Sequence, residues 1–189
     1  MEIVDYLRRE PFDKMKAFQD AANLCGKFCK ANALPIPKFV NDENCRHAGE
    51  YRSYTRTVTL NLLNSKTPQY TNWSWSWPGY KADMTPLGVC CHELGHHWHF
   101  FHGPKEVIQV WKQWIGDEKP VSSYGETSTG EDIAEAFKLF VDNPTLLRDL
   151  WPNRYAMFAS CLIPVEPRHW REILAGSPRH IRVVERKLR

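Results

Sequence analysis

The sequence lacks the features of membrane-spanning, secreted and zinc-ribbon proteins. No apolar run approaches the ~20 residues that a transmembrane helix needs, so no membrane partner is expected. The first ten residues show neither the basic start nor the apolar stretch of a signal peptide. No Cys-x-x-Cys occurs among the six cysteines, which excludes a zinc ribbon. We therefore expect reduced thiols and a cytoplasmic location, with virion association or non-classical export as alternatives.

An excess of charge of one sign is also missing from most of the chain. The net charge is only +3, which does not by itself indicate nucleic-acid binding. The bias is concentrated in residues 166–189, where six arginines and one lysine stand against three glutamates. A basic C-terminal tail of this kind is typical of a solvated chain end and, less often, of an arm that docks on a partner or a nucleic acid.

What the chain does have is a globular composition. Its 189 residues are 42% hydrophobic and 13% aromatic, with eight tryptophans, which excludes a disordered chain. This length is sufficient for one domain with a substantial core. We expect a single domain over residues 1–165, acting as a monomer, followed by the basic tail at 166–189.

Hydrophobic periodicity predicts a mostly helical chain with a small sheet, an α+β fold. Apolar residues recur at steps of three and four from Met15 to Cys29, which predicts an amphipathic helix over 13–32 with Cys25 and Cys29 in the core. Further helices are predicted at 86–102, 104–115, 131–141 and 145–160. The apolar side of the helix at 104–115 is expected to consist of Val107, Val110, Trp111 and Trp114.

Two stretches between the first two helices differ from this helical pattern. Alternation from Thr55 to Leu62 predicts a half-buried strand, and the stretch 46–54 can pair with it through a turn, although Gly49 weakens that second prediction. Residues 64–86 follow no clear period. Their three alternating indoles either line a substrate cleft or cap a core, and packing is the commoner role of a tryptophan cluster. These indoles belong to Trp73, Trp75 and Trp77.

Residues 92–96 read His-Glu-Leu-Gly-His, the pattern that narrows the chemistry most sharply. On an α-helix His92 and His96 lie about 40° apart around the axis and roughly 6 Å along it, so both imidazoles share one face. They can bind one Zn²⁺ ion, with Glu93 beside it as a base for metal-bound water. The alternative is a helix whose polar face carries these residues by chance. The mostly apolar stretch at 87–91 favours the zinc interpretation, because it is typical of a buried metalloprotease helix.

A catalytic zinc needs a third protein ligand besides a water. His102 stands at the third-ligand position of the metzincin pattern, but that pattern requires a glycine where this chain has His99. On a continuous helix His102 would lie roughly 15 Å from His92 along the axis. His97 points away from this face and His99 lies too far along it, so both are predicted to be surface or second-layer residues.

The better candidate for the third ligand lies on a later helix. Glu131 and Glu135 share one helical face, about 40° apart, with Asp132 turned roughly 100° away. Glu131 would complete a set of two histidines and one glutamate. Glu135 would accept a hydrogen bond from a ligand imidazole and set its tautomer. The alternative, an acidic solvated face, is weakened by the small and apolar residues between these acids.

At these motifs the chain resembles a known group of zinc peptidases. The His-Glu-x-x-His helix, Ser-Tyr-Gly at 123–125, a glutamate seven residues past the tyrosine and Ala-Glu-Ala-Phe at 134–137 are similar to the catalytic domain of anthrax lethal factor. Small Pro-Pro endopeptidases share the His-Glu-x-x-His and the tyrosine-to-glutamate spacing. The ending Ala-Glu-Ala-Phe-x-x-Phe-x-x-Asn-Pro is similar to metallopeptidase-like proteins of phages and prophages. The resemblance covers 87–143 and, more loosely, the strand at 56–63.

The resemblance implies a gluzincin-like metallopeptidase with a zincin-like fold. It implies His92, His96 and Glu131 as zinc ligands, and Glu93 as the general base. In zinc peptidases of this kind, the strand just before the metal helix offers unpaired backbone groups at its edge to an extended substrate.

The resemblance also assigns two residues outside the ligand set. Tyr124 matches the tyrosine that helps to stabilise the oxyanion, a role that suits a phenol opposite the metal. Glu135 matches the glutamate one turn beyond the ligand. The segment 125–130 keeps the length of the family pattern but not every residue, which leaves the choice of substrate open.

Two functions of different classes follow from these observations. The leading expectation is a zinc-dependent endopeptidase that hydrolyses a peptide or protein substrate through a zinc-activated water. The rival is an interaction or virion-associated protein that keeps the zinc helix as a scaffold and cuts nothing. The basic tail and the tryptophan-rich segment favour the rival, whereas the complete set of ligands, base and tyrosine argues against it.

Overall fold

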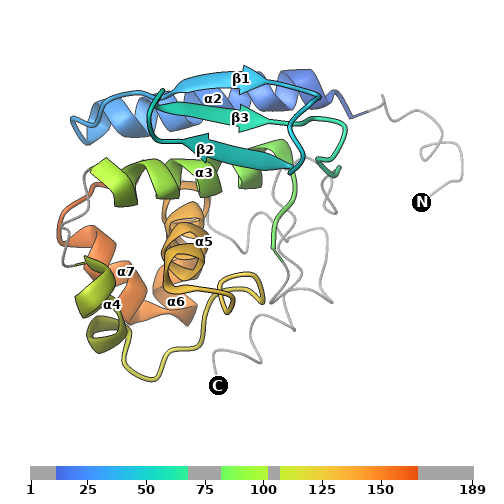
Figure 1. The fold of residues 1–189 in the computed structure, drawn as a ribbon. Helices are drawn as coiled ribbons and strands as arrows, with labels where there is room; N and C mark the ends of the chain where they lie inside the picture. The colour runs from blue at the N-terminus through green and yellow to red at the C-terminus, as the bar shows by residue number, and fades with distance from the viewer. Residues whose placement is uncertain (1–11, 68–81, 102–106, 166–189) are drawn as a thin grey trace, which may run out of the picture.

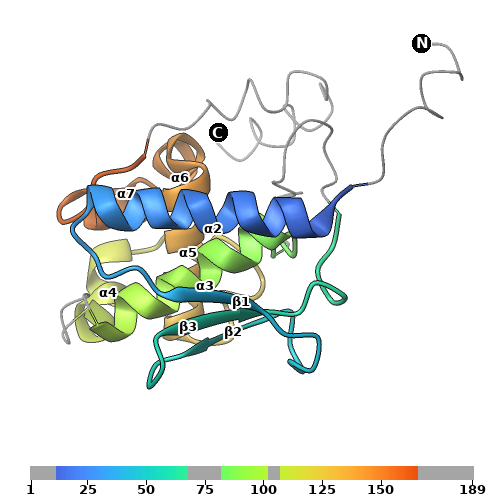
Figure 2. The ribbon, with the colours of Figure 1, turned by 90° about the horizontal axis from the view of Figure 1, so that it is seen from above.

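Helix α3 (Pro86–Phe101) lies between the sheet and most of the other helices (Figure 1). The computed structural model describes residues 12–67, 82–101 and 107–165. A three-stranded sheet packs on one side of α3 and helix α5 on the other. Figure 2 shows helix α2 running alongside α3. The predicted α+β fold, mostly helical with a small sheet, is confirmed.

The remaining elements follow one another along the chain with short connections. They are α2 (Lys14–Ala31), β1 (Lys38–Asn41), β2 (Gly49–Arg52), β3 (Thr57–Leu60), α4 (Val107–Ile115), α5 (Thr129–Asp142), α6 (Pro144–Leu150) and α7 (Pro152–Ala159). No helix in the described ranges is long and apolar enough to cross a membrane. The predictions for the three tryptophans at 73–77, for His102 and for the tail at 166–189 fall outside these ranges.

The sheet differs from the prediction in one respect that matters for the site. Its strand order is β1-β3-β2, with β1 parallel and β2 antiparallel to β3. The predicted strand at 55–62 is β3, and its predicted partner at 46–54 is β2. However, β3 is hydrogen-bonded on both sides, so the expectation that the strand just before the metal helix is the edge strand is wrong. In the described structure β2 is the edge strand that packs against α3.

Two helix predictions also needed correction. The stretch 145–160 forms two helices, because Pro152 has no N–H to continue α6 and instead takes the first position of α7. In α4 the buried stripe consists of Val107, Trp111 and Ile115 at steps of four, whereas Trp114 is 49% exposed. The predicted core positions in α2 are as expected, since both of its cysteines are buried free thiols.

A glycine sets the distance between α3 and α5. A Cβ on Gly95 would lie 2.8 Å from Ala134 Cα and 3.1 Å from Ala134 O, closer than ordinary van der Waals contact. The backbones of the two helices therefore touch at this point, and no larger residue fits. Because His92 and His96 flank Gly95 on α3, this contact also fixes how near they come to the first turn of α5.

We predict that Gly95→Ala lowers the free energy of unfolding by about 1–3 kcal/mol, because the added methyl group meets backbone atoms that cannot move aside. Chemical denaturation of the two proteins measures this difference. Gly26→Ala on α2 is the matched control, since no heavy atom lies within 4 Å of its Cβ position. That control should keep or raise stability. Equal effects of the two substitutions would contradict the account.

Candidate metal centre

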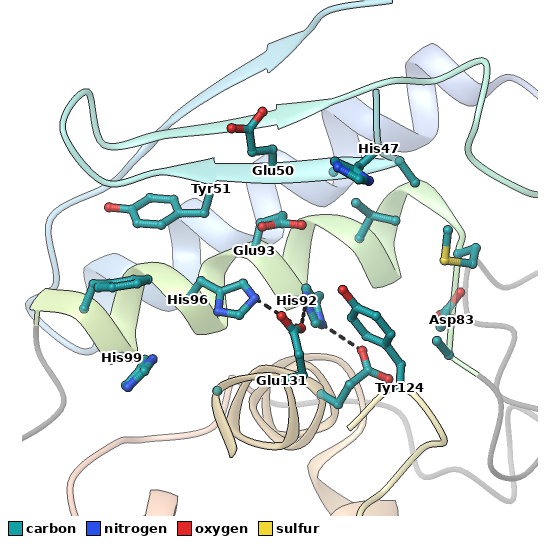
Figure 3. A pocket seen from close by; sticks show the side chains of 18 residues that line it. His47, Glu50, Tyr51, Asp83, His92, Glu93, His96, His99, Tyr124 and Glu131 are labelled. Atoms are coloured by element: carbon teal, nitrogen blue, oxygen red, sulfur yellow. Dashed lines mark hydrogen bonds and ion pairs between the residues drawn. The ribbon is translucent and has the colours of Figure 1, made fainter. Parts of the chain in front are cut away.

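Three side chains from α3 and α5 converge at the front of the α3–α5 contact (Figure 3). His92 Nε2 lies 3.1 Å from Glu131 Oε2, and His96 Nε2 lies 3.4 Å from the same oxygen. One ligand atom from each of the three residues lies within 4.8 Å of the other two. This group could hold a metal ion, and it contains the three residues that the motifs single out.

The local sequence explains how each ligand reaches this point. His92 and His96 are one helical turn apart, with their ring centroids 4.8 Å from each other. Helix α5 begins at its N-cap Ser128, whose Oγ accepts a hydrogen bond from the Glu131 backbone N–H. This start places Glu131 in the first turn, where its carboxylate faces α3 (Figure 3).

The chemistry of this group fits a divalent cation. Glu131 Oε2 is buried and, in the described structure, accepts no well-aligned hydrogen bond although two ring nitrogens are near it. Burial alone would raise the pKa of Glu131, but the contacts with His92 and His96 outweigh it and lower that pKa to about 2. The carboxylate is therefore ionised at neutral pH and ready to bind a positive charge. Two imidazoles and a carboxylate are typical ligands of a catalytic transition-metal ion.

Behind the first ring, Glu135 holds the orientation of His92. Glu135 Oε1 lies 2.8 Å from His92 Nδ1, and both side chains are buried. A proton on Nδ1 leaves the lone pair of Nε2 directed at the other ligands. In the metal-free chain, burial lowers the pKa of His92, but the contacts with Glu131 and Glu135 raise it to about 10. The two carboxylates therefore attract positive charge strongly to this imidazole.

Glu93 lies beside the ligand group, between α3 and the edge strand. Its side chain is 94% covered, and burial raises its pKa above the usual value, partly offset by His92 and His96. Strand β2 comes so close that a Cβ on Gly49 would lie 2.8 Å from Glu93 Oε1. A glycine at this position therefore leaves room for the carboxylate. A raised pKa suits a group that must accept a proton and return it.

Tyr124 approaches the ligand group from the segment before α5. Its ring centroid is 5.6 Å from that of His92, and the residue is 46% exposed (Figure 3). Partial burial raises the pKa of the phenol, and three nearby carboxylates raise it further. Tyr124 therefore keeps its proton at neutral pH and can donate a hydrogen bond.

These groups line one cleft of about 680 Å³. Residues 47–51, which include most of β2, form one wall, and α3 forms the floor. Glu131 and Tyr124 lie across the cleft from β2 (Figure 3). The cleft therefore exposes the candidate metal ligands, the buried acid Glu93 and the edge strand to the same space.

The other histidines of α3 take two different positions. His97 points away from the ligand face, as predicted, but it is fully buried and not on the surface. Its Nδ1 lies 2.8 Å from the Tyr51 hydroxyl and its Nε2 lies 2.9 Å from the Pro35 carbonyl oxygen. His99 lines the cleft but is not one of the three grouped ligands. Asp132 is turned away as predicted, and its carboxylate pairs with the buried Arg154 at 2.8 Å.

Three residues near the site were missed by sequence reasoning. Tyr51 borders the cleft from β2, while Ser122 and Lys138 contact Glu135. The spacing of Glu135 and Lys138, three residues apart on one helix, was the only local signal for any of them. Nothing in the sequence pairs Ser122 or Tyr51 with the motifs, because those contacts form only when separate segments fold together.

Comparisons with known proteins return no match: no protein-family model, no curated protein and no solved structure matches this chain. The resemblance at the motifs stays a prediction for that reason. The functional interpretation therefore depends on the geometry of the site itself.

We predict that His96→Ala weakens zinc binding by more than about 100-fold, because it removes one of three ligands. His99→Ala, one turn further along α3, is the control and should bind zinc as the unchanged protein does. Competition with a chromophoric chelator measures both affinities. Loss of binding in the His99 variant, or retention in the His96 variant, would show that the ion binds elsewhere.

Proposed function

We propose that this protein is a zinc-dependent endopeptidase. The observation that supports this most is the placement of a buried carboxylate, Glu93, and a protonated phenol, Tyr124, around the group of two histidines and Glu131 in one open cleft. A site that only binds a metal for stability is closed and needs neither a base nor an exposed cleft. Zinc is the ion that such a ligand set takes in hydrolytic sites.

His92, His96 and Glu131 would hold the zinc ion. When bound, zinc supplies Lewis-acid chemistry: it lowers the pKa of a water molecule and polarises a carbonyl. Glu93 accepts a proton from the attacking water, and its raised pKa also allows it to pass that proton to the leaving amine. Tyr124 donates a hydrogen bond to the carbonyl oxygen as negative charge develops there.

Strand β2 gives this site a way to bind a peptide. Within the described structure β2 pairs only with β3, so its other edge faces the cleft with free backbone groups. An extended peptide can add to that edge through main-chain hydrogen bonds. Its scissile carbonyl would then lie between the metal ligands and Tyr124. This mode of binding favours a peptide substrate over a small molecule.

We predict that Glu93→Gln keeps zinc at full stoichiometry but lowers the rate of peptide cleavage by about 10²- to 10⁴-fold, because the amide cannot accept the proton. Proteome-derived peptide mixtures, analysed by mass spectrometry for new termini, provide the substrates. Glu43→Gln is the control, since Glu43 is exposed and far from the cleft lining. A wild-type protein that binds zinc but cleaves no peptide would favour the rival, an inert metal scaffold. Full activity in the Glu93 variant would exclude this mechanism.

We predict that Tyr124→Phe lowers kcat by about 10²-fold with little change in KM, because the phenol acts on charge that develops only in the transition state. Steady-state kinetics on a peptide found in that screen measure this split. Tyr54→Phe is the control, since Tyr54 is 84% exposed and does not line the cleft. An equal rise in KM with unchanged kcat would instead assign Tyr124 to substrate binding.

A further inference from the structure

Lys138 is a buried cation close to the candidate metal centre. Its side chain is 2% exposed, and its Nζ lies 2.8 Å from each carboxylate oxygen of Glu135. Lysine is almost never fully buried unless it is paired, because removing its charge from water is costly. This lysine therefore needs an explanation that involves Glu135.

Glu135 connects Lys138 to the metal ligands and to a third segment. Its Oε1 lies 2.8 Å from His92 Nδ1, and its Oε2 accepts a hydrogen bond from the Ser122 hydroxyl at 2.5 Å. Burial tends to raise the pKa of Glu135, but Lys138 and His92 outweigh it and lower that pKa. One carboxylate thus contacts side chains from α3, from α5 and from the segment before α5, all of them buried.

The Ser122 contact links this carboxylate to the position of Tyr124. Ser122 Oγ accepts a hydrogen bond from the Gly125 backbone N–H at 3.2 Å. Gly125 directly follows Tyr124, and a Cβ on Gly125 would lie 3.3 Å from Asp132 Cα, so the segment packs closely on α5. A shift of the Glu135 carboxylate would therefore disturb both the ligand imidazole and the segment that carries the phenol.

Lys138 is directed to Glu135 although a second acid is near. Asp142, one turn further along α5, is buried, and its two carboxylate oxygens have no hydrogen-bond partner in the described structure. Burial raises the pKa of Asp142 well above its usual range, with Asp83 adding to the effect. A neutral Asp142 leaves the lysine charge to be balanced by Glu135, which matches the two short contacts there.

We propose that Lys138 is a positioning residue for the metal centre, which holds the Glu135 carboxylate between His92 and Ser122 and so orients the ligand imidazole and the Tyr124 segment together. This inference rests on the proposed function for its catalytic consequence, but its effect on metal binding does not require that the protein cleaves peptides. Without the ammonium, a buried carboxylate with one positive partner fewer would no longer be held in this geometry.

The test is a double-substitution cycle read out by zinc affinity and by the visible absorption of the Co²⁺-loaded protein. Lys138→Met should weaken zinc binding by about 10- to 100-fold, the usual effect of losing a residue that orients a metal ligand, and should alter the Co²⁺ spectrum. Lys138→Arg should restore part of the affinity. Lys112→Met, an exposed lysine on α4, is the matched control and should change neither readout.

The cycle separates a positioning role from a merely structural one. Glu135→Gln alone should weaken zinc binding, and adding Lys138→Met to it should cause less than about twofold further loss, because Lys138 acts through Glu135. Additive losses, or a folded Lys138→Met protein that binds zinc as the wild type does, would overturn the proposal.

A milder variant keeps the test valid if Lys138→Met does not fold. Ser122→Ala removes one hydrogen bond from the same carboxylate, and it should lower kcat more than it changes zinc affinity or KM. Unchanged kcat in that variant would overturn the link to Tyr124. A wild-type protein that binds zinc but is inactive would contradict the proposed function only, whereas failure to bind zinc would contradict both.

Discussion

The direct backbone contact between α3 and α5 is the constraint on which the rest of the structure depends. Gly95 and Ala134 let the two helices touch. That contact brings the two histidines of α3 within about a hydrogen-bond length of Glu131, at 3.1 and 3.4 Å. A separation larger by the width of one methyl group would open the ligand group, because side chains of fixed length cannot follow a moving helix. The glycine inside the His-Glu-x-x-His motif is thus a packing requirement of this site.

The site concentrates charge in a place where water is largely excluded, and each charge has a partner nearby. The carboxylates of Glu131 and Glu135 face the imidazoles, and the ammonium of Lys138 balances Glu135. Pairing of this kind is necessary because an isolated buried charge is costly. A metal ion at the three ligands would add the positive charge that this carboxylate-rich cluster attracts. The same burial raises the pKa of Glu93, the group proposed to move protons.

Much of the site could be predicted from the sequence because its parts are local. The spacing of His92 and His96, and of Glu131 and Glu135, places each pair on one helical face whatever the rest of the fold does. Contacts between distant segments carried no such signal. Ser122 reaches Glu135 and Tyr51 reaches His97 only in the folded chain, so neither partner could be named beforehand.

The fold class was also predictable, but the order of the strands was not. Strand β1 has four residues and follows two prolines, too short a stretch for alternation to show. Its pairing with β3 moves that strand to the centre and makes β2 the edge. The break before Pro152 was readable in principle, since proline cannot continue a helix. The exposure of Trp114 reflects which face of α4 the neighbouring helices happen to cover.

The most direct test of the metal centre is anomalous diffraction at the zinc edge from crystals of the zinc-loaded protein. The account predicts a peak about 2 Å from the Nε2 atoms of His92 and His96 and from a carboxylate oxygen of Glu131, with room for a water toward the cleft. A Glu131 side chain turned to solvent, or zinc bound only at other residues such as the buried thiols of Cys25 and Cys91, would contradict it.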